Sequence, residues 1–298
     1  MRLRMLASLT IVGLGLISWV LSRGVWSRPD EPLSSPVGNS LLASPATEEP
    51  AISQEAFAAS PSMRSIDEDE FPGAMIRSGR PREFYFSRAA YTGYGFRNFR
   101  SWSVDFPKAD RQFLIGLLRL TNIDAYEAEN PVQLTDPGLG RYPFLYAVEM
   151  GYMALSESEV LGLRRYLQAG GFLVIDDFWG SYEWENIVME FQRILPGHEI
   201  VDIPYDHPIF TCFYNVERII QVPNVGQGIA GGPTWEKDGY DPKLRGIFDE
   251  QGRLIVVINW NTDLGDAWEW AENPYYPLRF STYAYQMGVN FIIYGMSH

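Results

Sequence analysis

The sequence predicts an α/β domain with an open, mostly parallel sheet and helices on both faces, preceded by an N-terminal membrane-anchor helix and a disordered linker. Two observations carry this expectation. From Glu83 onward, short apolar runs alternate with segments of helical periodicity, which is typical of βαβ units. Before that point, residues 5–22 are apolar and residues 27–66 are rich in proline. The chain of 298 residues is 46% hydrophobic, enough for one sizeable core.

The N-terminal segment has the features of a signal anchor. Arg2 and Arg4 precede an uncharged run from Met5 to Ser22, which as a helix would be roughly 27 Å long, close to the thickness of a bilayer core. No A-x-A cleavage site follows, so we favour an uncleaved anchor and keep a cleaved signal peptide as the alternative. The short N-terminal tail indicates that the rest of the chain lies outside the cytoplasm. We therefore assign residues 1–26 to the anchor or signal peptide.

The segment from residue 27 to residue 79 is predicted to be a disordered linker rich in proline, serine and alanine. The acidic run Asp67 to Glu70 lacks the glycine and the ligand spacing of a calcium loop, so we interpret it as part of a solvated tether. The globular domain is expected to occupy residues 80–298.

The elements of the domain follow from periodicity and from residues that begin or end helices. Ser156 and Glu159 form a capping-box pattern at the start of one helix, which the pair Gly170 and Gly171 ends. The turn-like segment 249–252 predicts a hairpin between residues 244–248 and 253–259. Further strands are expected at residues 83–87, 144–148, 172–175, 199–203 and 218–222, and further helices at 108–120, 183–195 and 282–294.

Charge and cysteine usage exclude several functions. The net charge of -13 would repel a phosphate backbone, so nucleic acid is not an expected partner. The single cysteine, Cys212, permits neither an intrachain disulfide nor a cysteine zinc site, and its neighbours include no glycine that would allow a strained nucleophile turn. We expect a packed or half-buried thiol. The three histidines show no two-histidine metal spacing, so the sequence predicts neither a metal site nor a cofactor.

Polar residues follow several of the predicted strands, at the edge where open α/β sheets bind ligands. Asp176 and Asp177 end one strand, and because alternate side chains face opposite ways, we expect one to face a crevice and the other to cap the following helix. Arg88 is a candidate partner of this pair. Other binding or catalytic candidates at this edge are Glu149, Asn259, Asn261 and Asp263.

Two other polar segments have a structural and a functional interpretation. His207 precedes a proline and is interpreted as a hydrogen-bonded loop histidine, with a catalytic base as the alternative. The segment Gly226 to Gly232 opens no clear helix and contains no Lys-Ser/Thr pair, so a flexible loop is favoured over a phosphate-binding loop.

Aromatic residues are frequent in the loops predicted at the same edge of the sheet. Most are expected to pack in the core, but an exposed cluster beside carboxylates would suit sugar stacking or a protein contact. Trp179 and Trp268 are the two candidates for binding. The complete set is Trp179, Tyr182, Trp184, Trp260, Trp268, Trp270, Tyr275 and Tyr276.

Several segments together resemble the bacterial domain of unknown function 4159 family. The longest runs from Tyr166 to Phe178, through the glycine pair and the aspartate pair. The resemblance covers about residues 82–296 and also rests on segments 142–146, 155–159, 206–210, 252–254, 261–265 and 288–290.

The resemblance implies a flavodoxin-like fold related to class I glutamine amidotransferases and ThuA-like proteins. In that wider group, the turn after the strand that follows the glycine pair can present a nucleophile. Here this turn carries Asp176, Asp177 and Phe178 instead of a cysteine, so glutamine amidotransfer is not expected. Family members are often encoded beside AAA+ ATPases and von Willebrand factor A-type membrane proteins, which implies envelope protein partners.

Three functions are compatible with the sequence. The first is a membrane-tethered, non-catalytic binding or assembly module of the cell envelope, because the scaffold is recognisable and the nucleophile is not. The second is a carboxylate-dependent, metal-assisted hydrolase that uses Asp176, Asp177, Glu149 and Asp263, with His207 as its base. The third is an envelope carbohydrate-binding domain. Convergence of the carboxylates within metal-ligand distance would favour the enzyme, and a flat aromatic patch would favour binding.

Overall fold

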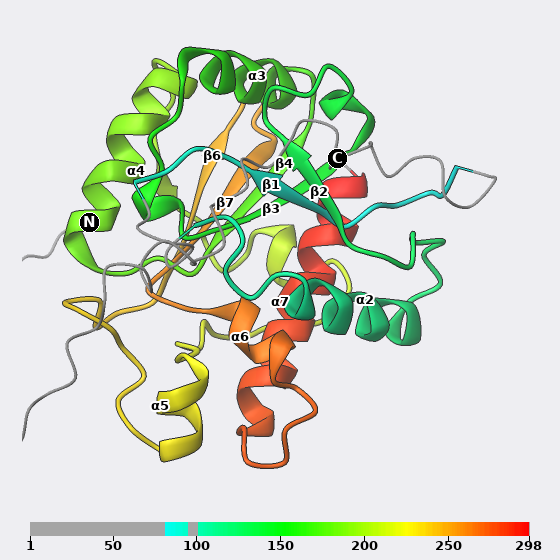
Figure 1. Ribbon diagram of the computed structural model, residues 1–298, viewed down its shortest axis with the longest axis vertical. Helices are drawn as coiled ribbons and strands as arrows, with labels where there is room; N and C mark the ends of the chain where they lie inside the picture. Colours follow the sequence, from blue (N-terminus) through cyan, green and yellow to red (C-terminus); the bar gives the residue numbers. More distant parts are fainter. Residues whose placement is uncertain (1–80, 95–100, 298) are drawn as a thin grey trace, which may run out of the picture. The chain divides into compact units, whose positions relative to one another are not determined.

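The computed structural model describes residues 81–94 and 101–297, which form an α/β domain around a seven-stranded sheet (Figure 1). The strand order is β2-β1-β3-β4-β7-β6-β5, and neighbours from β2 to β7 pair in parallel, whereas β6 is antiparallel to both β7 and β5. The strands are β1 Ser87–Ala90, β2 Asn130–Gln133, β3 Phe144–Val148, β4 Phe172–Asp176, β5 Val201–Asp202, β6 Lys243–Phe248 and β7 Leu254–Trp260.

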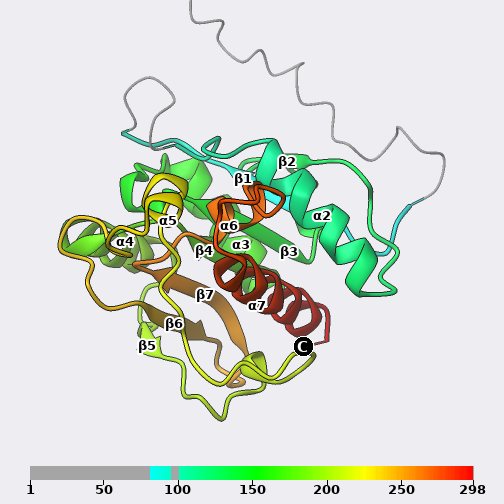
Figure 2. The same ribbon diagram turned by 90° about the horizontal axis from the view of Figure 1, so that it is seen from below.

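Helices cover both faces of the sheet (Figure 2). The central strands carry apolar side chains on both faces, so each face must be shielded from water by a layer of helices. One face packs against α3 (Glu157–Gln168) and α4 (Gly180–Ile194). The other packs against α2 (Lys108–Leu120), α6 (Leu264–Glu269) and α7 (Leu278–Ser297). The remaining helices are α5 Val225–Ala230 and the 3-10 turns η3 Leu139–Arg141, η4 Met150–Tyr152 and η5 Pro208–Phe210.

Several local predictions are confirmed. The helix expected at residues 108–120 is α2, and Ser156 caps α3 with both hydrogen bonds of a capping box to Glu159. The hairpin expected around residues 249–252 is β6 and β7.

Other local predictions are wrong. The first strand begins at Ser87 and not at Glu83, residues 218–222 form no strand, and β2 was not expected. The glycine-rich segment predicted as a loop contains α5, whose first turn is capped by the Asn224 side chain accepting from Gln227 N–H. These elements are only four to six residues long, which is too short to show a strand or helix periodicity in the sequence.

Within the described ranges, no helix is long and apolar enough to cross a membrane. The anchor expected at residues 5–22 and the linker expected at residues 27–79 lie outside the described residues.

Candidate functional site

The exits of β4 and β7 are joined by backbone hydrogen bonds at the carboxyl edge of the parallel sheet. Asp177 N–H donates to the Thr262 carbonyl at 3.2 Å, and Asn261 N–H donates to the Phe178 carbonyl at 3.0 Å. Phe178 and Thr262 thereby form an isolated antiparallel bridge beyond the parallel strands. This bridge brings Asp177 and Asp263 together, although they are far apart in the sequence.

A third carboxylate, Asp105, reaches this edge from the segment that precedes α2. Arg88 on β1 holds that segment, because its guanidinium donates to the Trp102 and Val104 carbonyls at 3.4 and 3.2 Å. The same guanidinium pairs with Asp110 in the first turn of α2 at 2.7 Å, and both side chains are fully buried. Arg88 therefore fixes the start of α2, which packs against α6, and with it the position of Asp105.

The carboxylates converge into two groups that share one residue. Asp105, Asp177 and Asp263 each offer an oxygen, and these atoms lie within 4.8 Å of one another. Asp105, Asp266 and Glu269 form a second group that meets the same distance. We call these five residues the acidic cluster. Hard oxygen ligands at this spacing are typical of Mg²⁺, Mn²⁺ and Ca²⁺ sites.

Hydrogen bonds within the protein satisfy the acidic cluster only in part. Asp177 accepts from the Trp179 indole N–H at 3.0 Å, and Asp263 accepts from Asp266 N–H at 2.7 Å as the N-cap of α6. Asp105 Oδ2 is shielded from solvent and has no hydrogen-bond partner. An unpaired buried carboxylate oxygen is costly, so the site has an open requirement for a proton or a cation.

Glycine at position 265 leaves room for this oxygen. A Cβ at Gly265 would lie 2.9 Å from Asp105 Oδ2, 3.1 Å from the Tyr146 hydroxyl and 3.5 Å from Asp263 Oδ1. These three polar atoms therefore surround the first turn of α6. Any side chain at this position would displace Asp105.

Burial and mutual repulsion raise the carboxyl pKa values in this region. Burial is the largest cause for Asp105, Asp177 and Asp263, whose pKa values all lie well above the usual range. Neighbouring carboxylates add to it, with Asp266 acting on Asp105 and Asp177 acting on Asp263. Clustered shifts of this kind are common where proteins bind cations or catalyse reactions.

Left-handed backbone is concentrated at the same edge. Among the described residues other than glycine, five have a positive φ. Asp105 has φ 62°, Glu149 has φ 54°, Asp177 has φ 50° and Asn261 has φ 62°, and the fifth is Lys237. Such conformations cost free energy and persist where the surrounding structure holds them, which is frequent at functional sites.

Comparison with known protein families matches residues 88–296 to the family described as Domain of unknown function (DUF4159). The chain belongs to this family. A search of curated proteins finds no match.

In this DUF4159 domain, Asp176 and Asp177 have different surroundings. Asp176 Oδ2 accepts from the Tyr146 hydroxyl at 2.7 Å and from the N–H groups of Leu264 and Gly265 at 2.9 and 3.1 Å. It therefore stabilises the start of α6, whereas the sequence predicted that one member of the pair would cap the next helix along the chain. Burial raises the pKa of Asp176 to about 7. Asp177 is the member of the pair that joins the acidic cluster.

The other polar residues predicted at this edge either support the surrounding loops and helices or lie near the acidic cluster without belonging to it. Arg88 binds Asp110, so the expectation that it pairs with the two aspartates is wrong. Asn261 accepts from Gly180 N–H and donates to the Asp241 carbonyl, which ties three loops together. Asn259 is buried, and its Nδ2 has no partner among the described atoms. Glu149 lies close enough to Asp177 to raise its pKa.

The two remaining candidates with reactive side chains do not belong to the acidic cluster. His207 caps η5 by accepting from Ile209 N–H at 3.2 Å, and its ring packs on Phe248 and Tyr294 at the amino edge of the sheet. Cys212 is half-buried, its thiol donates to the Asn290 carbonyl at 3.3 Å, and burial raises its pKa. Both arrangements are structural.

The aromatic residues mostly pack inside the domain. Trp179, Trp268 and Tyr276 are buried. Trp184 and Trp260 lie against each other, with the Arg245 guanidinium 4.3 and 4.8 Å from their ring centres. Tyr182 and Tyr275 are the exposed members, and Trp270 carries the Lys108 ammonium 3.8 Å from its ring.

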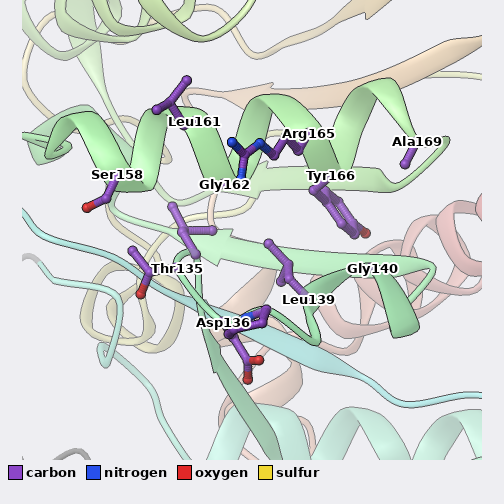
Figure 3. A pocket seen from close by; sticks show the side chains of 12 residues that line it. Thr135, Asp136, Leu139, Gly140, Ser158, Leu161, Gly162, Arg165, Tyr166 and Ala169 are labelled. Carbon is purple, nitrogen blue, oxygen red and sulfur yellow. The ribbon is translucent and has the colours of Figure 1, made fainter.

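A separate cavity of about 500 Å³ lies between α3 and the segment that follows β2 (Figure 3). Leu161, Arg165 and Tyr166 of α3 form one wall, and Thr135 and Leu139 from the segment after β2 form the other. None of the acidic cluster lines this cavity.

Sequence reasoning missed Asp105, Asp266 and Glu269. Asp105 precedes a helix and follows no strand, so a search of strand ends does not reach it. Asp266 and Glu269 are three residues apart on α6, and this i, i+3 spacing in a helix too short to be recognised was the only available signal.

Proposed function

We propose that the domain is a carboxylate-dependent, cation-assisted hydrolase whose divalent cation is held by Asp105, Asp177 and Asp263. The observation that carries this proposal is the convergence of their oxygens within 4.8 Å, beside the shielded and unpaired Asp105 Oδ2. Convergence is the criterion that separates an enzyme from a flat binding surface. We therefore favour the hydrolase over the non-catalytic module, which was the first of the three functions inferred from the sequence.

The scaffold supports a reaction that does not use a thiolate. Numbered along the chain, the five parallel strands have the order 2-1-3-4-5, with β7 as the fifth, which is the flavodoxin-like order also expected from the amidotransferase resemblance. In the amidotransferase-like group that the sequence resembles, the turn after the strand that follows the glycine pair can present a nucleophile, and in this chain that strand is β4. Asp177 occupies this turn with φ 50°. A carboxylate in place of a cysteine suits cation binding and excludes the amidotransferase thiol chemistry.

A cation at this position would supply a reactive water at neutral pH. Divalent ions bound to carboxylates lower the pKa of a coordinated water and polarise the bond under attack. The residues of the chain would orient this water. Asp177 is itself oriented by the Trp179 indole, and Asp263 by its capping bond to α6.

The proposed setting is the cell envelope, because residues 5–22 would anchor the domain in the bacterial inner membrane as a single span. A periplasmic or secreted protein after signal cleavage is the alternative. Envelope proteins encoded with an AAA+ ATPase remain the proposed partners.

A non-catalytic binding or assembly module is the second candidate function, and burial favours it. The residues Asp177 and Asp263 are only 8% and 3% exposed, so a cation bound between them would have little contact with a large substrate. In this case the cation would order the edge for a partner protein and no turnover would be seen.

The test is Mn²⁺ binding to the purified full-length chain by isothermal titration calorimetry, followed by hydrolysis assays with ester and phosphoester chromogenic substrates. We expect binding that Asp177→Asn and Asp263→Asn abolish. Asp206→Asn, an exposed carboxylate outside the cluster, is the matched control and should bind like the wild type. Binding without turnover would select the assembly module. If no cation binds, both forms of the proposal fail.

A further inference from the structure

We propose that the centre is binuclear, with Asp105 as the carboxylate that bridges two divalent cations, and that its substrate is a phosphoester. This inference rests on the proposed cation site and specifies it further. Asp105 is the residue that the two carboxylate groups share, with Asp177 and Asp263 on one side and Asp266 and Glu269 on the other. Two cations joined by one carboxylate are typical of two-metal hydrolytic sites, where they lie about 4 Å apart.

The environment of Asp105 fits a bridging role. Its Oδ2 is shielded from solvent and has no hydrogen-bond partner, so this oxygen is available for a cation. The absence of a side chain at Gly265 keeps the space beside it open. Arg88, which fixes the segment of Asp105, has its guanidinium engaged by Asp110, so it does not neutralise the cluster by direct contact.

Charge balance also favours two cations. The acidic cluster contains five carboxylates, the three of the first group and the two that the second group adds. When all are ionised, one divalent cation leaves three uncompensated negative charges in a poorly solvated site, whereas two cations leave one. Uncompensated buried charge is expensive, so occupancy of both positions is the more stable arrangement.

The second position is the one that a substrate would meet. Asp177, Asp263 and Asp266 are buried, whereas Glu269 is only half-buried, so the second group reaches toward the surface through Glu269. Asp266 Oδ2 accepts from Val225 N–H at 2.6 Å, which holds this carboxylate beside Glu269. The outer cation could therefore exchange water for a substrate oxygen while the inner cation stays enclosed.

A phosphoester is the substrate class that this arrangement fits. Oxygen ligands select Mg²⁺ or Mn²⁺, and paired ions of this kind stabilise the attacking and leaving oxygens of an in-line displacement at phosphorus. In the reaction, a water oxygen forms a bond to phosphorus while the bond from phosphorus to the ester oxygen breaks. The electron pair of that bond leaves on the ester oxygen, which takes up one proton of the water to give an alcohol and phosphate. The net charge of -13 disfavours polyanionic substrates.

Mn²⁺ stoichiometry of the full-length chain tests the inference, with free Mn²⁺ counted by electron paramagnetic resonance and p-nitrophenyl phosphate as the substrate probe. We expect two ions per wild-type chain. Glu269→Gln should retain one ion and lose at least tenfold in phosphatase rate, and Asp105→Asn should lose both ions. Glu272→Gln, an exposed neighbour that contacts Lys108 and Gln112, is the control and should retain two ions.

The outcomes separate this inference from the proposed function. One ion per wild-type chain, with Glu269→Gln unchanged, would overturn the binuclear centre and leave the single-cation site standing. No bound ion would overturn both. Two ions without hydrolysis of the phosphate ester would refute the substrate class. Glu269 is only half-buried, so its glutamine variant should fold, and a thermal melt of each variant verifies this.

Discussion

The two edges of the parallel sheet treat their aspartates in opposite ways. At the amino edge, Asp249 lies in the β6–β7 turn, where burial acts to raise its pKa. Hydrogen bonds from the backbone N–H and guanidinium of Arg253 and from Gln251 N–H outweigh burial, so its pKa is lowered. At the carboxyl edge, burial and neighbouring carboxylates raise the pKa of Asp177. At the amino edge the protein's own groups compensate the aspartate, whereas at the carboxyl edge they compensate it only in part.

This difference indicates that the carboxyl edge lowers the stability of the fold and that the amino edge does not. A group that is fully paired contributes to the fold, whereas a cluster that repels itself weakens the fold unless a ligand binds. The contrast can be tested with substitutions that remove a paired charge at one site and a repelling carboxylate at another.

The largest expected effect is at the pair that supports the carboxyl edge. Arg88→Met leaves Asp110 charged and unpaired in the core, which should lower the free energy of unfolding by about 3–5 kcal/mol in urea denaturation. The double variant Arg88→Met/Asp110→Leu removes both charges and should recover most of this loss. Equal destabilisation in the single and double variants would show that packing, and not the charge, is responsible.

The next effect concerns the space beside Asp105. Gly265→Ala places a Cβ 2.9 Å from Asp105 Oδ2, and because a carboxylate at the end of a side chain can move, the protein should fold while Mn²⁺ affinity falls by about tenfold, or about 1.4 kcal/mol. Gly140→Ala meets no atom within 4 Å and is the matched control. Unchanged affinity in Gly265→Ala would place the cation away from Asp105.

Substitution of one aspartate at each edge should have opposite signs. Without added cation, Asp177→Asn should raise the free energy of unfolding by about 1 kcal/mol, because asparagine tolerates a left-handed backbone and removes repulsion. Asp249→Asn should lower it by about 1 kcal/mol through its weakened bond to Arg253. A carboxyl pKa raised in the folded state means that folding retains protons, so stability falls as pH rises through that pKa. The gain from Asp177→Asn should therefore be larger at pH 8 than at pH 5. Changes of the same sign at both positions would contradict the comparison.

The smallest effect is expected at the thiol. Cys212→Ser should change the free energy of unfolding by less than about 1.5 kcal/mol and leave Mn²⁺ binding intact, since the half-buried thiol does not belong to the acidic cluster. Because burial raises its pKa, iodoacetamide should modify it more slowly than a free cysteine at pH 8. Loss of an enzymatic activity in Cys212→Ser would reopen the question of a thiol mechanism.

Elements with strong local signals could be predicted from the sequence. The apolar face of α2, the capping box of α3 and the β6–β7 turn each depend on residues close together in the chain. β2 could not be predicted in this way, because Pro131 argues against a strand and is tolerated only since β2 is at an edge of the sheet. α6 could not be predicted from local sequence either, because it is stabilised by Asp176 at the end of β4, which is far from α6 in the chain.

The candidate site was predictable to the extent that strand ends predict it. Asp177 and Asp263 follow β4 and β7 and were named for that reason. Asp105 depends on Arg88, whose partner Asp110 lies on the next helix, and no spacing rule connects these three positions. The residue that both carboxylate groups share was therefore the one that only the tertiary structure could supply.

The direction of the first parallel strand has a practical consequence for handling the protein. The described chain enters β1 from the amino edge, and α7 ends beside the same edge. There the Tyr294 ring packs against Phe172 at the start of β4, and the Tyr294 hydroxyl accepts from Leu254 N–H at the start of β7. Attachment through residue 81 or residue 297 thus leaves the opposite edge uncovered. A sensor chip or a fluorescent fusion joined at either point should keep the acidic cluster accessible to ions and substrates in solution.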